Sequence, residues 1–219
     1  MERMPFRPDL DLGRGLSIPI TGDVAASDWR AALPVMEGAS VTLRELRLTD
    51  APSLLAMLTT EEVARFMSPP PTDVRGFERF IVWTHQERTA GRLACFGIVP
   101  EGYDEAVGLF QVRQLEPDFA TAEWGVAIGS AFWGTGAYPE SATLVAEFVF
   151  ETLGVHRLEA RAAVLNGRAN GALQKIGAVQ EGVLRRSFLK NGQYLDQILW
   201  SILREDWHRS RPGPRAIIH

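Results

Sequence analysis

The chain has 219 residues, of which 46% are hydrophobic and 23% are charged, a balance typical of a folded domain and not of a disordered segment. With 23 basic and 27 acidic residues the net charge is −4, which argues against a nucleic-acid-binding protein. No apolar run approaches the ~20 residues of a membrane span, the first residues lack the pattern of a secretion signal, and the single cysteine, Cys95, excludes an intramolecular disulfide. We therefore expect a cytoplasmic protein without a metal, a membrane contact or a nucleic-acid partner.

Residues 1–40 mix prolines, glycines and scattered charges, and no period of 2 or 3.6 persists in them. We expect an irregular N-terminal extension there, attached to the body by a short apolar patch at 29–36. From residue 41 the patterning becomes regular. It predicts strands at 41–48, 92–99, 106–115, 121–128, 156–164, 178–189 and 194–203, and helices at 49–58, 61–67, 77–90, 138–152 and 168–176. Asn191 and Gly192 predict a two-residue hairpin turn between the last two strands, and the whole order indicates a mixed α/β sheet.

The segment 132–141 (FWGTGAYPES) carries the clearest chemical signal. It joins the predicted strand 121–128 to an amphipathic helix, and free N–H groups at such a helix start, together with the helix dipole, favour a phosphate. The dinucleotide fingerprint is excluded because Pro139 stands where its third glycine belongs, and the Gly-Lys-Ser/Thr of the nucleotide P-loop is absent. The residues alone leave two readings of Gly134 and Gly136, another kind of phosphate site or an ordinary strand-to-helix turn.

Several motifs, in this order along the chain, resemble the GNAT superfamily of N-acetyltransferases, and most closely its RimJ/RimL-like branch of ribosomal-protein-alanine acetyltransferases. They are AEWG at 122–125, WGTGA at 133–137, NGRAN at 166–170, ALQKIGA at 172–178, EGV at 181–183 and the terminal Asp196, WSIL at 200–203 and Trp207. The resemblance covers 41–207 and implies an α/β (α+β) GNAT fold, with a central mixed, mostly antiparallel sheet flanked by helices and splayed between its fourth and fifth strands. It leaves 208–219 as a C-terminal tail.

The resemblance also implies an activity, the transfer of an acetyl group from acetyl-CoA to a primary amine by direct attack in a ternary complex. The acceptor is a protein N-terminus or a small-molecule amine, and we allow for a homodimer. A CoA-binding module without catalysis and a transferase of a longer acyl group are the alternatives. The residues that the resemblance assigns to the cofactor are Val126, Ile128, Trp133, Gly134, Thr135, Gly136, Ala137, Asn166 and Asn170.

Glu123 is the residue that we expect to orient the amine or to accept its proton. It lies in an otherwise apolar run, 122–128, in which an acidic residue indicates a specific role. On a strand it shares a face with Gly125 and Ala127, whose small side chains leave room for a ligand. The alternative is a carboxylate at the strand end that is paired with an arginine.

Two positions depart from the family pattern. Tyr138 stands where the family often has glycine or alanine, and Ala169 stands where the branch usually has a serine near the thiol. Without that serine, Tyr138, Tyr194, Ser187 or water is left to protonate the departing thiolate. We therefore predict Glu123, Tyr138 and Ser187 as the catalytic residues.

Overall fold

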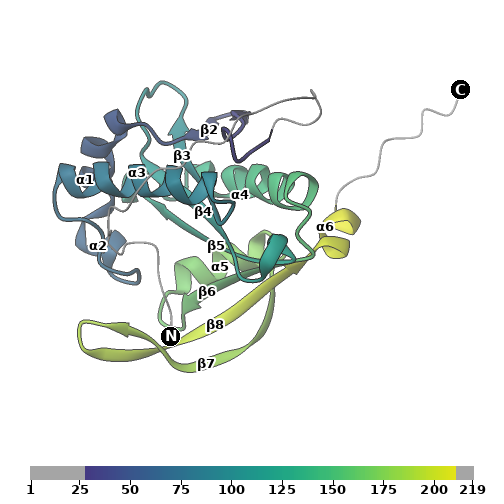
Figure 1. Cartoon of the computed structure of the whole chain (residues 1–219). Coiled ribbons are helices and arrows are strands. Elements are labelled where there is room, and N and C mark those ends of the chain that lie inside the picture. The colour runs from purple at the N-terminus through teal and green to yellow at the C-terminus, as the bar shows by residue number, and fades with distance from the viewer. Residues whose placement is uncertain (1–27, 211–219) are drawn as a thin grey trace, which may run out of the picture.

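The computed structural model describes residues 28–210, so the expectations for 1–27 and 211–219 lie outside the described residues. Within that range eight strands form one sheet in the order β1-β2-β3-β4-β5-β6-β8-β7 (Figure 1). The strands are β1 (Met36–Glu37), β2 (Val41–Glu45), β3 (Leu93–Pro100), β4 (Gly108–Gln114), β5 (Thr121–Ile128), β6 (Arg157–Ala163), β7 (Val179–Lys190) and β8 (Gln193–Leu203). The helices are α1 (Ala51–Leu58), α2 (Glu61–Ala64), α3 (Val74–Thr89), α4 (Ala137–Glu147), α5 (Gly167–Lys175) and α6 (Arg204–Ser210). The predicted mixed α/β fold is confirmed.

The described strands are antiparallel to their neighbours except for β5 and β6, which run parallel. β5 and β6 are the fourth and fifth strands predicted from the sequence, between which the family resemblance implies a separation. Their numbers in the structure are one higher because the two-residue strand β1 precedes the first predicted strand and pairs with β2. A strand of two residues is too short to produce a readable alternation.

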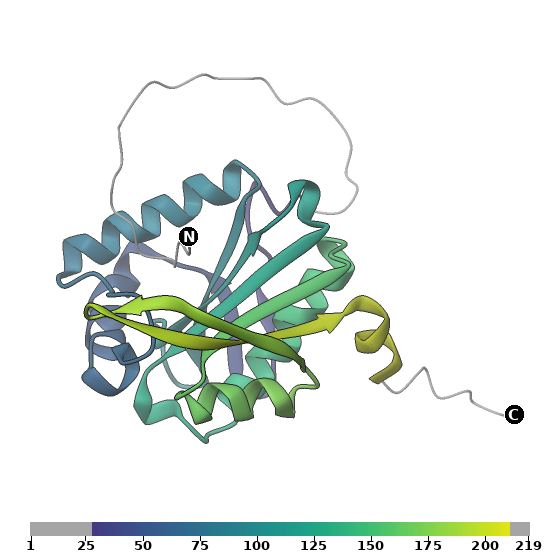
Figure 2. The same cartoon turned by 90° about the horizontal axis from the view of Figure 1, so that it is seen from below.

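Helices cover both faces of the sheet (Figures 1 and 2). Successive residues of β3 point to opposite faces, as a strand requires. Phe96 packs in a buried cluster with Val145 of α4, whereas Cys95 packs in a second cluster with Ile81 of α3. The first cluster also holds Trp207 of α6. The central strands are therefore buried on both faces and form a rigid base for the loops at their ends.

The described end of the predicted extension packs onto the domain. Leu33 is buried, and the ring of Trp29 meets the ring of Phe119 edge-to-face with 5.5 Å between centroids. Farther along, Glu140 of α4 accepts a hydrogen bond from the backbone N–H of Ser40 at 3.0 Å. Residues 28–40 are thus held by aromatic packing at one end and by a helix carboxylate at the other.

Three local features refine the predicted elements. The predicted helix 138–152 is α4 followed by a π-helical turn, Phe148–Thr152, and α6 was not predicted. Asn191 and Gly192 both have positive φ, 50° and 79°, which is the backbone of the predicted hairpin turn.

No helix within residues 28–210 is long and apolar enough to span a membrane.

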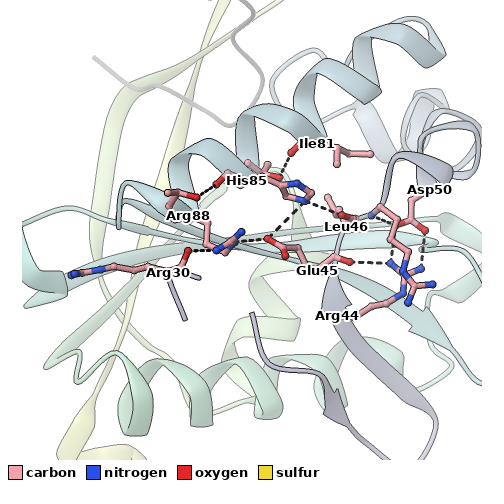
Figure 3. A network of polar contacts seen from close by, with 11 residues as sticks. Arg30, Arg44, Glu45, Leu46, Asp50, Ile81, His85 and Arg88 are labelled. Atoms are coloured by element: carbon pink, nitrogen blue, oxygen red, sulfur yellow. Dashed lines mark hydrogen bonds and ion pairs between the residues drawn. The ribbon is translucent and has the colours of Figure 1, made fainter. Parts of the chain in front are cut away.

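Polar contacts on both sides of β2 tie this strand to its surroundings (Figure 3). Arg44 donates to both carboxylate oxygens of Asp50 at 2.8 Å, and Asp50 also accepts from the backbone N–H of Ala106 at 3.0 Å. The next residue, Glu45, forms an ion pair with Arg88 of α3. These contacts join β2 to the start of α1, to the β3–β4 connection and to α3.

Candidate active site

The loop between β5 and α4 adopts a conformation that favours glycine at two of its positions. Gly134 has φ +79° and Gly136 has φ +95°, a region that L side chains rarely occupy. A Cβ at either position would meet no heavy atom within 4 Å, so the space above the loop is open. α4 begins at the next residue, Ala137. Because the first N–H groups of a helix lack partners within it, this loop offers backbone donors to an anion.

One contact holds this loop against the end of β5, and another closes the loop on itself. The indole N–H of Trp133 donates to the carbonyl of Ile128 at 3.2 Å, and the hydroxyl of Thr135 donates to the carbonyl of Phe132 at 2.9 Å. The loop and its donors are therefore fixed relative to the strand that precedes them.

A positive charge lies beside the same loop, and the sequence analysis did not predict it. The guanidinium of Arg168, in the first turn of α5, lies over the ring of Trp133 at 3.9 Å from the centroid. Asn166 caps that helix, since its side-chain oxygen accepts from the N–H of Ala169 at 3.1 Å. The contact between Arg168 and Trp133 places the N-terminal turn of α5 beside the loop that leads into α4.

The sheet opens directly before this loop. β5 and β6 pair over three residues, from Thr121 to Glu123, and within the described residues no strand continues that pairing along the rest of β5. On its other side β5 stays paired with β4 as far as Ile128. Val126 is 39% exposed, and a Cβ at Gly125 would meet nothing within 4 Å. The backbone groups of β5 that point away from β4 therefore face a gap that can take an extended ligand.

Asn170 is occupied by contacts within the protein. Its amide N–H groups donate to the carbonyls of Ala163 and Asn166, each at 3.0 Å, and its oxygen accepts from the indole N–H of Trp200 at 2.9 Å. The side chain joins α5 to β6 and β8. Its cofactor contact stays a prediction, and the observed role is to hold α5 in place.

Glu123 is bound by two arginines. Its carboxylate accepts from the Nε of Arg113 on β4 at 2.7 Å and lies 3.6 Å from the Nε of Arg161 on β6. The side chain is 12% exposed. The arginine pairing that the sequence left open is therefore present, and it leaves Glu123 on the same face as Gly125, at the closed end of the gap.

These contacts continue as a row of alternating charges from β4 to β7. Arg161 lies 3.9 Å from Glu159, which lies 2.8 Å from Arg157, and Arg157 donates to Glu181 at 2.7 Å. Hydrogen bonds from Arg157 and Ser201 lower the pKa of Glu181 to about 2. Glu123 therefore belongs to an ionic network whose partners come from neighbouring strands, which the spacing along one strand does not reveal.

The structure does not bring Tyr138 and Ser187 to Glu123. The ring of Tyr138 stacks on Phe110, on the opposite face of the sheet, and burial raises the pKa of its phenol. The hydroxyl of Ser187 lies 2.9 Å from the side-chain oxygen of Gln197. Their roles as proton donors to the thiolate stay predictions.

A glycine loop that opens a helix, set beside a parallel strand pair that separates after three residues, is the arrangement that the resemblance to GNAT acetyltransferases implies. Residues 40–179 match the family model described as the acetyltransferase (GNAT) domain, and the chain belongs to that family. The resemblance found in the sequence is confirmed.

Relatives of this chain carry related names. It is 26% identical over 168 residues to p20 of Bacillus licheniformis, an uncharacterized N-acetyltransferase, with 76% of this chain and 94% of that one covered. It is 26% identical over 117 residues to the ribosomal protein uS5-alanine N-acetyltransferase of Escherichia coli, with 53% and 60% covered. The structure of Mycobacterium smegmatis RimJ in complex with CoA-disulfide has the same fold, with a TM-score of 0.70, 22% identity and coverage of 77% and 87%.

Proposed function

We propose that the protein transfers the acetyl group of acetyl-CoA to a primary amine and that the gap beside β5 holds the cofactor. The observation that supports this proposal is that the gap leads directly into the glycine loop. The indole N–H of Trp133, in the loop, donates to the carbonyl of Ile128 at the end of β5, the strand that borders the gap. The pyrophosphate would accept hydrogen bonds from backbone N–H groups at 134–137, and the pantetheine arm would pair with the free edge of β5 at Val126 and Ile128. Release of the CoA thiol in the presence of an amine tests the transfer.

Arg168 would add a charge to this phosphate site. We expect Arg168→Gln to raise the Kd for CoA about fivefold, because a charge-assisted contact is lost. Arg168→Lys should restore part of the affinity, and Arg185→Gln, on exposed β7, should not change it. Turnover of acetyl-pantetheine, which lacks the nucleotide phosphates, should be the same in the wild type and in Arg168→Gln. An equal loss with that short substrate would contradict a phosphate contact and indicate damage to the loop.

The acceptor that fits this site best is an α-amine. At pH 7 an α-amine with a pKa of 7.7–8.0 loses its proton at a cost of about 1 kcal/mol, whereas a lysine requires about 4.6 kcal/mol. Glu123, the residue proposed to receive the amine, already faces the guanidinium groups of Arg113 and Arg161. The smaller cost of deprotonation makes an α-amine the easier nucleophile at neutral pH. Together with the name of the E. coli relative, this favours a protein N-terminus.

Glu123 would orient the amine and take its proton, directly or through one water. We expect Glu123→Gln to lower turnover about ten- to a hundredfold, the loss of one charge-assisted contact, while the Kd for CoA stays unchanged. Glu159→Gln is the matched control, because Glu159 stands opposite Glu123 on β6 and shares the contact with Arg161. Equal losses in both variants, or a loss of CoA binding in Glu123→Gln, would assign Glu123 to the ionic network alone.

A further inference from the structure

Lys190, at the end of β7, makes a contact that the cofactor site does not use. Its Nζ donates to the carbonyl of Ala64 at 2.8 Å and to the carbonyl of Met67 at 2.7 Å. Ala64 is the last residue of α2, and Met67 lies in the turn that follows it. A cation is favourable at the C-terminal end of a helix. Burial lowers the pKa of Lys190. The partners of Lys190 are thus two backbone carbonyls of α2 and the turn after it.

Lys190 reaches α2 because the end of the β7–β8 hairpin is bent. Gln197 is the first residue of β8 that pairs with β6. Between Leu184 and Gln197 the hairpin is a two-stranded segment, residues 184–197, here called the arm. A bulge interrupts its register, and Arg186 has φ 51° there. Asp196 accepts from the N–H of Arg186 at 2.7 Å, and Gln197 contacts Ser187 at 2.9 Å. A bulge bends the strand that carries it, and these bonds fix the bend.

The bent arm crosses the gap between β5 and β6. In the sheet, β8 and β7 lie on the β6 side of that gap. α2 follows directly on α1, which packs on the other side, because Leu54 and Leu58 share a buried cluster with Leu109 of β4 and Ala127 of β5. Figure 2 shows the hairpin, in yellow-green, running across the sheet toward these helices. The contact of Lys190 with α2 thus joins the two halves of the sheet on the face that carries Glu123.

We propose that Lys190 is a positioning residue for the acceptor amine, because it holds the arm across the side of the gap from which the amine approaches. This rests on the proposed function, in which the amine meets Glu123 on this face. The arm and α2 form two walls of the acceptor entrance. A two-stranded segment is marginally stable by itself, so without Lys190 the acceptor must order the arm as it binds, which weakens its affinity. The glycine loop is anchored separately and keeps its affinity for CoA.

The test compares Lys190→Met, which removes the N–H donors and keeps a long side chain, with Lys190→Arg, which restores donors. Lys175→Met, at the exposed end of α5, changes the only other lysine and is the matched control. With acetyl-CoA and a peptide that starts with alanine, we expect Lys190→Met to raise the KM for the peptide about tenfold, as the loss of charge-assisted hydrogen bonds requires. Its kcat and its Kd for CoA should match the wild type, as should all constants of Lys190→Arg and Lys175→Met.

Hydrogen exchange on the same variants measures the contact itself. Lys190→Met should exchange faster at 61–67 and at 184–197 and should be unchanged in α5. Faster exchange with an unchanged peptide KM would overturn the proposal, and so would unchanged exchange. A wild-type protein that transfers no acetyl group to any amine would instead overturn the proposed function, and this proposal with it.

Discussion

Replacing Gly136 with valine should abolish CoA binding, with a rise in Kd of about a hundredfold or more. Gly136 has φ +95°, so a β-branched residue there forces the backbone to move at the first turn of α4. The backbone N–H groups that would bind the pyrophosphate then turn away, and losing two charge-assisted hydrogen bonds accounts for at least that factor. Isothermal titration with CoA measures the effect.

Gly154→Val is the matched control for that substitution. Gly154 has φ +72° and, like Gly136, open space at its Cβ, but it lies beyond the other end of α4. Both variants should lose similar stability, about 1–3 kcal/mol for a strained backbone position. Only Gly136→Val should lose CoA. A folded Gly136→Val protein that binds CoA as the wild type does would refute the assignment of the loop.

Replacing Asp50 with asparagine should produce the largest loss of stability, about 3–5 kcal/mol, because it leaves the buried guanidinium of Arg44 without its charge partner. The side chain of Asp50 is completely buried and that of Arg44 is 8% exposed. Urea unfolding measures the free energy. Asp206→Asn is the control, since Asp206 pairs with Arg209 on the outer side of α6, where their side chains are 38% and 72% exposed, and its loss should cost less than about 1 kcal/mol. Equal, small effects in both variants would contradict a structural role for the buried pair.

The same pair makes a testable contribution to acid stability. Burial raises the pKa of Asp50, but hydrogen bonds from Arg44, Arg47 and Ala106 outweigh it and hold the pKa below its ordinary value. A carboxyl whose folded pKa is depressed stabilises the protein above its unfolded pKa of about 3.9 and loses this contribution as pH falls through the folded value. The difference in unfolding free energy between wild type and Asp50→Asn should therefore be greatest near neutral pH and shrink in acid.

The parts of the fold that could be predicted are those encoded by neighbours in sequence. β5 has the predicted bounds, 121–128, because an apolar run lies between clear turns. The hairpin turn at Asn191 and Gly192 was equally clear, since two residues with positive φ favour that dipeptide. β1 and the π-helical turn after α4 could not be predicted, because a two-residue strand has no period and a π turn depends on tertiary packing.

The candidate site divides in the same way. The glycines of the loop are visible in the sequence because φ near +90° almost requires that residue. Arg113 and Arg161 become partners of Glu123 only through the register of β4 and β6 against β5. Lys190 and α2 are more than a hundred residues apart in the sequence, and the bent arm brings them into contact. Charged partners were therefore missed wherever they depend on three-dimensional neighbours.

The proposed transfer of an acetyl group from acetyl-CoA to an amine can be measured directly. The most direct measurement incubates the wild type with acetyl-CoA and a peptide that starts with alanine, and follows the CoA thiol and the peptide mass together. We expect one acetylated N-terminus for each thiol released, and neither product from Gly136→Val. If the wild type binds CoA but acetylates no amine in a panel of peptides and small primary amines, the protein is a CoA-binding module, and the proposed transferase activity is wrong.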